Sequence, residues 1–200
     1  MQPQSFVFMG RYGAGKGTQA ALLIERLKKR DSTPVIHIET GAEFRKFFQG
    51  ETYTAKLSKS IIEQGYLMPE FMCVYIWGSI LEGKFTGKEH LVFDGTPRKL
   101  LEAKMLQGVF PFYSFPKPWL IYLDVEHEES AKRISLRSAN SGRKDDGAEA
   151  LEKRRKAYEE DIVPTIEWYK TNPDVNFLDI DGERPIEEVH AEIVKKIGLE

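Results

Sequence analysis

The sequence contains very little cysteine, since Cys73 is the one cysteine among 200 residues. A single thiol cannot form an internal disulfide or a multi-cysteine zinc site, so the sequence excludes both. Long hydrophobic runs are missing too, and no apolar stretch is long enough to span a bilayer. The first apolar run, 5–9, is also too short for the hydrophobic region of a signal peptide. We therefore expect a cytoplasmic protein with no membrane partner.

An excess of charge of either sign is absent as well. The 29 basic and 31 acidic side chains leave a net charge of -2, so no overall positive field attracts nucleic acid. Apolar residues make up 41% of the chain and charged residues 30%, which is typical of a globular domain with a buried core. We expect one domain over 1–200.

Short apolar segments recur along the chain, and several lack the polar alternation of a half-exposed strand. Such segments are typical of strands that are covered on both faces in a parallel sheet. The predicted strands are 5–9, 35–38, 91–93, 119–125 and 175–180. Because helical segments separate them, the pattern predicts an α/β fold with a doubly wound five-stranded parallel sheet.

Two stretches interrupt the alternation of strands and helices. More than fifty residues separate the second predicted strand from the third, which is more than one crossover helix needs. The three predicted helices of this stretch, which indicate a helical insertion able to move relative to the sheet, are 42–48, 54–64 and 69–81. The second stretch, 137–146, is polar and is predicted to be a mobile surface loop before a long charged helix, 148–168.

The segment 10–19, G-R-Y-G-A-G-K-G-T-Q, is the most informative part of the chain. It follows the first predicted strand and precedes residues whose apolar side chains recur at helical spacing. In this context a glycine-rich turn predicts a phosphate-binding loop, because backbone N–H groups and a helix N-terminus converge on an anion. Lys16 would supply a cation for the β- and γ-phosphates, and Thr18 a hydroxyl near magnesium. An ordinary glycine-rich turn is the alternative.

Arginines gather where the predicted strands end, which is where ligands bind in open α/β sheets. Arg45 follows the second strand, and Asp94 and Arg98 follow the third. The remaining arginines of this set come after the fourth strand: Arg133, Arg137, Arg143 and Arg154.

Taken together, these motifs resemble those of the adenylate kinase family, and more broadly of nucleoside monophosphate (NMP) kinases. The segment 10–19 is similar to the family's G-x-P-G-x-G-K-G-T-Q, with Tyr12 in place of proline. T-G-A-E-F-R at 40–45 resembles T-G-x-x-x-R, and D-G-T-P-R at 94–98 resembles D-G-F-P-R. Three further segments, similar to G-x-L-V-P, R-x-D-D and a closing D-G motif, lie at 65–69, 143–146 and 181–185. The six matches follow the family's order over nearly the whole chain.

The resemblance implies a P-loop NTPase-like fold, in which an insertion over about 40–70 binds the monophosphate and a short lid covers about 137–147. The catalytic residues that it implies are Lys16, Arg98, Arg137, Arg143 and Arg154. The implied ATP-binding residues are Gly13, Ala14, Gly15, Lys16, Gly17, Thr18, Arg133, Arg137 and Arg184. The implied AMP-binding residues are Thr40, Gly41, Arg45, Leu67, Met68, Gly95, Arg98 and Glu102.

The resemblance also carries expectations about cofactors and partners. Thr18 and Asp94 would hold the Mg²⁺ that accompanies ATP, largely through water. Five residues lie between Arg137 and Arg143, which leaves no room for the zinc-bearing hairpin of some relatives. Asp145 and Asp146 would orient the lid arginines, or simply favour a helix N-terminus as acidic residues do. A monomer is expected, with ATP and AMP as its partners.

Glu102 departs from the family's pattern at the acceptor base. Adenylate kinases commonly have glutamine four residues after the arginine of D-G-F-P-R, where its amide donates to adenine N1 and accepts from N6. An ionised carboxylate only accepts, so guanine N1–H or cytosine N4–H would suit Glu102 better than adenine N1. AMP is the favoured acceptor, and CMP, UMP or GMP are the alternatives.

The predicted function is reversible, Mg-dependent phosphoryl transfer from ATP to AMP, giving two ADP. Such transfer needs fixed cations around both sets of phosphates rather than a nucleophilic side chain. A kinase of a small metabolite is one alternative, which the T-G-x-x-x-R segment and the base-pocket residues disfavour. A catalytically inactive nucleotide-binding module for regulation is another. The joint presence of Lys16, Arg98, Arg143 and Arg154 disfavours the inactive module.

Overall fold

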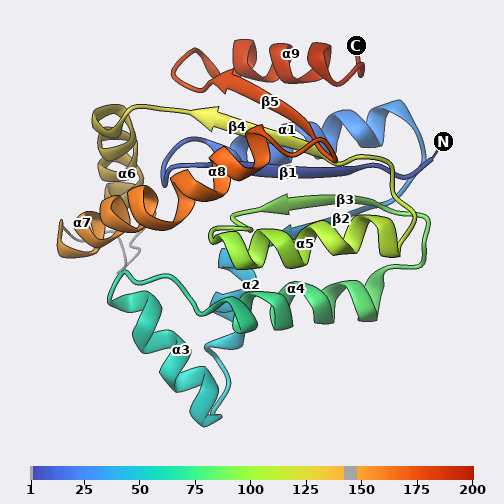
Figure 1. Cartoon of the computed structure of the whole chain (residues 1–200). Helices are drawn as coiled ribbons and strands as arrows, with labels where there is room; N and C mark the ends of the chain where they lie inside the picture. The colour runs from blue at the N-terminus through green and yellow to red at the C-terminus, as the bar shows by residue number, and fades with distance from the viewer. Residues whose placement is uncertain (1, 142–147) are drawn as a thin grey trace.

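A computed structural model of the chain describes residues 2–141 and 148–200, with side chains for 2–136 and 151–200. Parallel strands form one sheet in the order β2-β3-β1-β4-β5 (Figure 1). The strands are β1 (Ser5–Gly10), β2 (Val35–Glu39), β3 (His90–Asp94), β4 (Trp119–Asp124) and β5 (Asn176–Asp181). The predicted α/β fold with a five-stranded parallel sheet is therefore confirmed.

Burial along the strands explains their apolar composition. Every residue of β1 and β3 is buried, because both strands lie inside the sheet with helices on each face. The edge strands β2 and β5 each bury a single residue fully, Ile38 and Ile180. The central strands therefore carry the continuous apolar runs that predicted a parallel sheet.

Helices cover both faces of the sheet, and alternate residues of β1 pack into two separate cores. Phe6 and Phe8 pack with α1 (Lys16–Arg30) and α9 (Ile186–Lys196). Val7 and Met9 pack with side chains of the helices on the other face, α4 (Glu70–Lys84), α5 (Leu100–Phe112) and α8 (Val163–Lys170). The two cores clamp β1 in place, so the loop that follows it leaves the sheet at a fixed position.

The predicted helical insertion corresponds to α2 (Thr40–Phe47) and α3 (Tyr53–Glu63), which lead from β2 to α4. Figure 1 shows α3 projecting away from the sheet, beyond α2 and α4. It buries little, since Ala55 and Ser58 are its buried residues. Thr52 caps this helix, with its hydroxyl accepting a hydrogen bond of 3.1 Å from the N–H of Ala55.

One local prediction was wrong. The loop predicted from residue 137 begins later, because α6 (His127–Ser141) continues through the first half of that segment. Residues 137–141 include no glycine or proline, and a polar composition by itself does not end a helix. Residues 142–147 lie outside the described part of the chain.

The long helix predicted over 148–168 is divided into α7 (Ala148–Ala157), a π-helical turn (Tyr158–Ile162) and α8. Pro164 lies in the first turn of α8 and has no N–H to continue the regular ladder. The N–H of Val163 instead bonds to the carbonyl of Tyr158, five residues earlier. Over the ranges that the structure describes, no helix is long and apolar enough to cross a membrane.

The cap of α3 is open to a direct test. Thr52→Ala removes the acceptor for the Ala55 N–H, and losing such a cap costs about 1 kcal/mol of helix stability. We expect amide hydrogen exchange in 53–63 to be several times faster, with α4 and the strands unchanged. Thr54→Ala is the matched control, since it deletes an exposed threonine hydroxyl one residue inside the same helix. Equal exchange in the two variants would show that the cap has no effect.

Candidate active site

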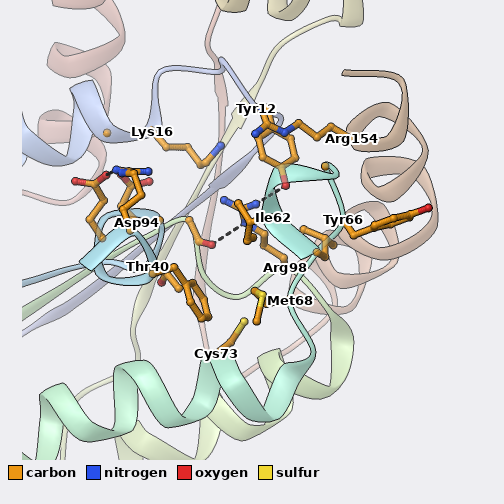
Figure 2. Close-up of a pocket in the computed structure, with 18 of the residues that line it drawn as sticks. Tyr12, Lys16, Thr40, Ile62, Tyr66, Met68, Cys73, Asp94, Arg98 and Arg154 are labelled. Atoms are coloured by element: carbon orange, nitrogen blue, oxygen red, sulfur yellow. Dashed lines mark hydrogen bonds and ion pairs between the residues drawn. The ribbon is translucent and has the colours of Figure 1, made fainter. Parts of the chain in front are cut away.

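A cavity of about 680 Å³ opens beside the phosphate loop and the segments that follow β2 and β3. Sixteen of the predicted site residues line it. They are Gly13, Gly15, Lys16, Gly17, Thr18, Thr40, Gly41, Arg45, Leu67, Met68, Asp94, Gly95, Arg98, Glu102, Arg133 and Arg154. Figure 2 shows Arg98 in the middle of this space, with Tyr12 above it and Met68 and Cys73 below. The fold thus brings together residues from both halves of the sequence.

Two predicted site residues with described side chains, Ala14 and Arg184, do not line the cavity. Ala14, within the loop, is buried. Arg184 pairs with Glu192 and lies 3.4 Å from the Asp181 carboxylate. The backbone of Arg137 belongs to α6, and its side chain lies outside the description, as do Arg143, Asp145 and Asp146.

The phosphate loop has the backbone shape that its glycines predict. Gly13 and Gly15 have φ of 78° and 93°, a left-handed conformation that strains any residue with a Cβ. Gly15 is the N-cap of α1, so the helix begins at Lys16. The Lys16 ammonium donates to the carbonyls of Gly10, at 2.9 Å, and Arg11, at 2.6 Å. The loop therefore combines a left-handed glycine backbone, a helix N-terminus and a nearby cation, which suit an anion site.

Gly17 lies where the loop meets the end of β3. A Cβ at Gly17 would lie 3.1 Å from Asp94 Oδ2, so a side chain there would press on the carboxylate. This contact gives a physical reason for a glycine between Lys16 and Thr18. Asp94 is 8% exposed, and burial raises the pKa of its carboxyl although Lys16 opposes the shift. The site therefore holds one desolvated carboxyl beside the phosphate loop.

Glu102 is buried in the floor of the cavity and both of its oxygens are engaged. Oε1 accepts a short hydrogen bond from the Thr96 hydroxyl, and Oε2 accepts from the N–H of Arg98 at 2.9 Å. Burial, the largest influence, raises the pKa of Glu102 above its ordinary value, while these hydrogen bonds and the Arg98 charge act against the shift. The carboxyl is thus fixed in orientation within the cavity wall.

The guanidinium groups on the two sides of the cavity have local partners. Arg45 donates to Glu39 at 3.0 Å, and this contact keeps the Arg45 guanidinium group beside the end of β2. Arg133 donates to Glu129 at 2.8 Å and to the Gly182 carbonyl at 2.9 Å, linking α6 to the segment after β5. Each arginine is held by a nearby acceptor, so the positive charges have defined positions.

Sequence analysis gave no role to Tyr12, although it noted the departure from proline. In the structure Tyr12 lines the cavity and its hydroxyl accepts a hydrogen bond from Arg98. The guanidinium carbons of Arg98 and Arg154 lie 4.6 Å and 4.4 Å from its ring centre. An aromatic residue in a phosphate loop, in a chain with several arginines near strand ends, is a signal that could have indicated these contacts.

An apolar wall on the insertion side was also missed. Phe44, Phe48, Ile62 and Tyr66 line the cavity together with the thiol of Cys73. Burial raises the pKa of Cys73 well above its ordinary value, so the thiol stays protonated and behaves as an apolar group. A wall of this kind suits the flat face of an aromatic ligand.

The fold and the cavity define a P-loop protein of the nucleotide-phosphotransferase class, with anion-binding elements at one end and an apolar recess at the other. A family model described as adenylate kinase matches residues 8–174. The chain belongs to the adenylate kinase family and is a phosphotransferase enzyme.

Individual relatives resemble the chain over most of its length. The adenylate kinase of Prochlorococcus marinus is 35% identical over 177 residues, which cover 88% of this chain and 90% of the relative. The adenylate kinase of Phocaeicola vulgatus is 31% identical over 193 residues, covering 96% and 97%. That of Parabacteroides distasonis is 31% identical over 192 residues, 96% of each chain. The resemblance inferred from the motifs is therefore confirmed at the level of the family.

The raised pKa of Glu102 leads to a testable pH dependence. The folded protein binds this proton more tightly than the unfolded chain does, so stability is lost as the pH rises above the ordinary glutamate pKa. Glu102→Gln removes that charge, while its amide can donate to Thr96 Oγ1 and accept from the Arg98 N–H. We expect the variant to melt roughly a few degrees higher than the wild type at about pH 8.

This difference in melting temperature should shrink as the pH falls to about 4, because below its ordinary pKa Glu102 becomes mostly neutral in both states of the wild type. Glu82→Gln, at an exposed position on α4, is the matched control and should melt with the wild type throughout. Thermal melts monitored by circular dichroism across this pH range make the measurement. If Glu102→Gln is less stable than the wild type at about pH 8, the result would contradict a raised pKa of Glu102.

Proposed function

We propose that the protein catalyses reversible, Mg-dependent phosphoryl transfer from ATP to AMP, giving two ADP. The observation that carries this proposal is that one cavity joins the phosphate loop to Arg45, Arg98 and an apolar wall. Such a cavity has room and charge for two nucleotides whose phosphates meet in the middle. Membership of the adenylate kinase family, and relatives that bear this name, support the same reaction.

On the donor side, the phosphate loop would bind the ATP phosphates through its N–H groups and the Lys16 ammonium. Arg133 would add positive charge from α6. This assignment is supported by the position of Lys16, whose ammonium is held over the loop by two carbonyls. Arg184 stays a prediction as an ATP contact, because its contacts in the structure are with Glu192 and Asp181.

On the acceptor side, Arg45 and Arg98 would hold the monophosphate, with Thr40, Gly41 and Gly95 providing close backbone approach. Leu67 and Met68, with the apolar wall of the insertion, would contact the base. Arginine's planar fork suits bidentate contacts with phosphate oxygens. Pre-positioned guanidinium groups stabilise the charge that moves with the phosphoryl group, and no covalent intermediate is needed.

Magnesium fits the residues that are present. Asp94 supplies one desolvated carboxyl and Thr18 one hydroxyl, both lining the cavity. Among the described residues, no group of three or more acidic, histidine or cysteine side chains could hold a metal ion. One carboxylate, a hydroxyl and water match an ion that is bound partly through substrate phosphates. Bound with ATP near Asp94 and Thr18, Mg²⁺ would offset the negative charge of the donor phosphates.

We further infer that the insertion, about 40–70, and a short lid, about 137–147, close over the nucleotides and exclude water. Arg137 and Arg143 would then approach the transferred phosphoryl group together with Arg154. Support comes from a contact between α7 and the insertion, where the Lys153 ammonium lies 4.8 Å from the Tyr66 ring centre. A cytoplasmic monomer without structural zinc, nucleic-acid or membrane partners completes the proposal.

AMP is the proposed acceptor, and Glu102 need not oppose the binding of its adenine base. A neutral carboxyl group has one donor and one acceptor, as the amide of glutamine has. Burial raises the pKa of Glu102, which favours this neutral form. CMP, UMP or GMP as acceptors, with the same chemistry, are the alternatives that an ionised Glu102 would favour.

Steady-state assays with ATP and each monophosphate test the acceptor. We expect AMP to give the highest kcat/KM, and Glu102→Gln to keep or improve this preference, because its amide offers the same donor and acceptor without a charge. A wild type that prefers CMP, UMP or GMP would overturn the choice of base. Transfer to none of them would overturn the proposed function and favour an inactive nucleotide-binding module.

Arg98→Ala tests the position of the acceptor phosphate. The change removes a cation from the middle of the cavity, so turnover should fall by about 10²-fold or more while the melting curve stays cooperative. Arg155→Ala is the matched control, because Arg155 lies next to Arg154 but outside the cavity lining, and pairs with Glu152 on α7 and Glu159 in the π-helical turn. Its turnover should stay within about twofold of the wild type. Persistent activity in Arg98→Ala would place the acceptor phosphate elsewhere.

A further inference from the structure

Tyr12 makes contacts that connect the phosphate loop to two arginines from distant parts of the chain. Arg98 donates from Nη1 to the Tyr12 hydroxyl, and its guanidinium carbon lies 4.6 Å from the ring centre. Arg154, which is 6% exposed, has its guanidinium carbon 4.4 Å from the same ring centre. Figure 2 shows Tyr12 between the two arginines, with Arg154 beside it at the top of the view and Arg98 below it in the middle.

The backbone of Tyr12 is itself firmly held. The Ser130 hydroxyl on α6 donates to the Tyr12 carbonyl at 2.5 Å. A Cβ on the next residue, Gly13, would lie 2.9 Å from the Ser130 carbonyl oxygen, so the loop packs closely against α6. The ring therefore projects from a part of the loop with a defined position, and it can act as a support for other side chains.

Two guanidinium groups that approach one another repel, and each long side chain loses rotamer freedom when it is fixed. The negative face of an aromatic ring attracts a cation, most strongly where water is partly excluded. Arg98 also donates from Nε to the Gly95 carbonyl at 2.8 Å. The ring and hydroxyl of Tyr12 offset the repulsion and orient Arg98 and Arg154 before any phosphate arrives.

We propose that Tyr12 is a positioning residue that holds Arg98 and Arg154 in place for the phosphoryl groups. Its aromatic ring supports both guanidinium groups, and its hydroxyl aligns Arg98 in addition. Its role in the reaction rests on the proposed function, in which these arginines contact phosphate. The support that it gives the arginines is a property of the protein without nucleotide and is testable without catalysis.

The first experiment measures how the arginines react with an arginine-selective dicarbonyl reagent, followed by peptide mass spectrometry on the nucleotide-free protein. In Tyr12→Leu, modification of Arg98 and Arg154 should be about tenfold faster than in the wild type, because the ring no longer holds them. Arg155 serves as the reference within the same molecule and should keep its rate. In Tyr12→Phe, Arg154 should react as in the wild type and Arg98 at an intermediate rate.

Two further variants control for folding and for the loss of an aromatic ring. Tyr12→Pro removes the ring but introduces the residue that the family's loop usually has, so it keeps the test valid if Tyr12→Leu does not fold. Tyr53→Leu removes a tyrosine that is 82% exposed and lies outside the cavity lining, and should leave all three rates unchanged. Wild-type rates at Arg98 and Arg154 in both Tyr12→Leu and Tyr12→Pro would overturn the proposal.

The second experiment asks whether the support matters for the reaction. Tyr12→Leu should lower kcat about tenfold and raise KM for the monophosphate severalfold, with KM for ATP within about twofold, because misplaced arginines affect the acceptor phosphate and the transfer itself. Tyr12→Phe should recover kcat to within about threefold. Equal losses in Tyr12→Leu and Tyr12→Phe would contradict support by the ring. If the wild type transfers to no monophosphate, the proposed function fails while the arginine reactivities still decide the role of Tyr12.

Discussion

The junction between the phosphate loop and the carboxyl end of β3 is the constraint on which the whole site depends. The pairing of β1 with β3 sets Phe8 beside Asp94, and the segments that follow the two strands leave the sheet at the same edge. Across this junction Gly17 meets the Asp94 carboxylate, and Tyr12 meets Arg98. A buried, fully packed β1 gives the loop little freedom to shift, so both contacts are rigidly defined. A one-residue change of strand register would separate the carboxyl, the cations and the loop.

Concentrated positive charge is the second requirement, and the chain meets it without a basic composition. The arginines around the cavity come from different elements, and each has an acceptor or an aromatic ring at hand. Glu39 holds Arg45, the Gly95 carbonyl and Tyr12 hold Arg98, and Glu129 holds Arg133. Cations whose positions are set in advance need little reorganisation when phosphate charge develops, which is the main electrostatic contribution to catalysis of this kind. The net charge of -2 is thus compatible with a cavity lined by more basic than acidic side chains.

Much of the fold was predictable because it depends on local patterns. Buried strands required apolar runs, and the glycines of the loop required a left-handed backbone, so the segment after β1 could be recognised in advance. The end of α6 was predicted wrongly because polar residues are compatible with both a loop and an exposed helix. The π-helical turn before α8 was not predictable, because a proline is also compatible with the first turn of a regular helix. Within the site, sixteen of the predicted residues line one cavity, while their individual roles remain predictions.

By itself, the sequence determined the fold class, the phosphate loop and the family, since each is written in short-range periodicity and in motifs with their order. Only the tertiary structure decided which side chains support the functional ones. Tyr12 and Arg98 are 86 positions apart, and no local pattern predicts that one will hold the other. Likewise, burial rather than residue type sets the protonation tendency of Glu102, because desolvation depends on everything that packs around a carboxyl. Strand order and packing bring these groups together, and both are properties of the whole fold.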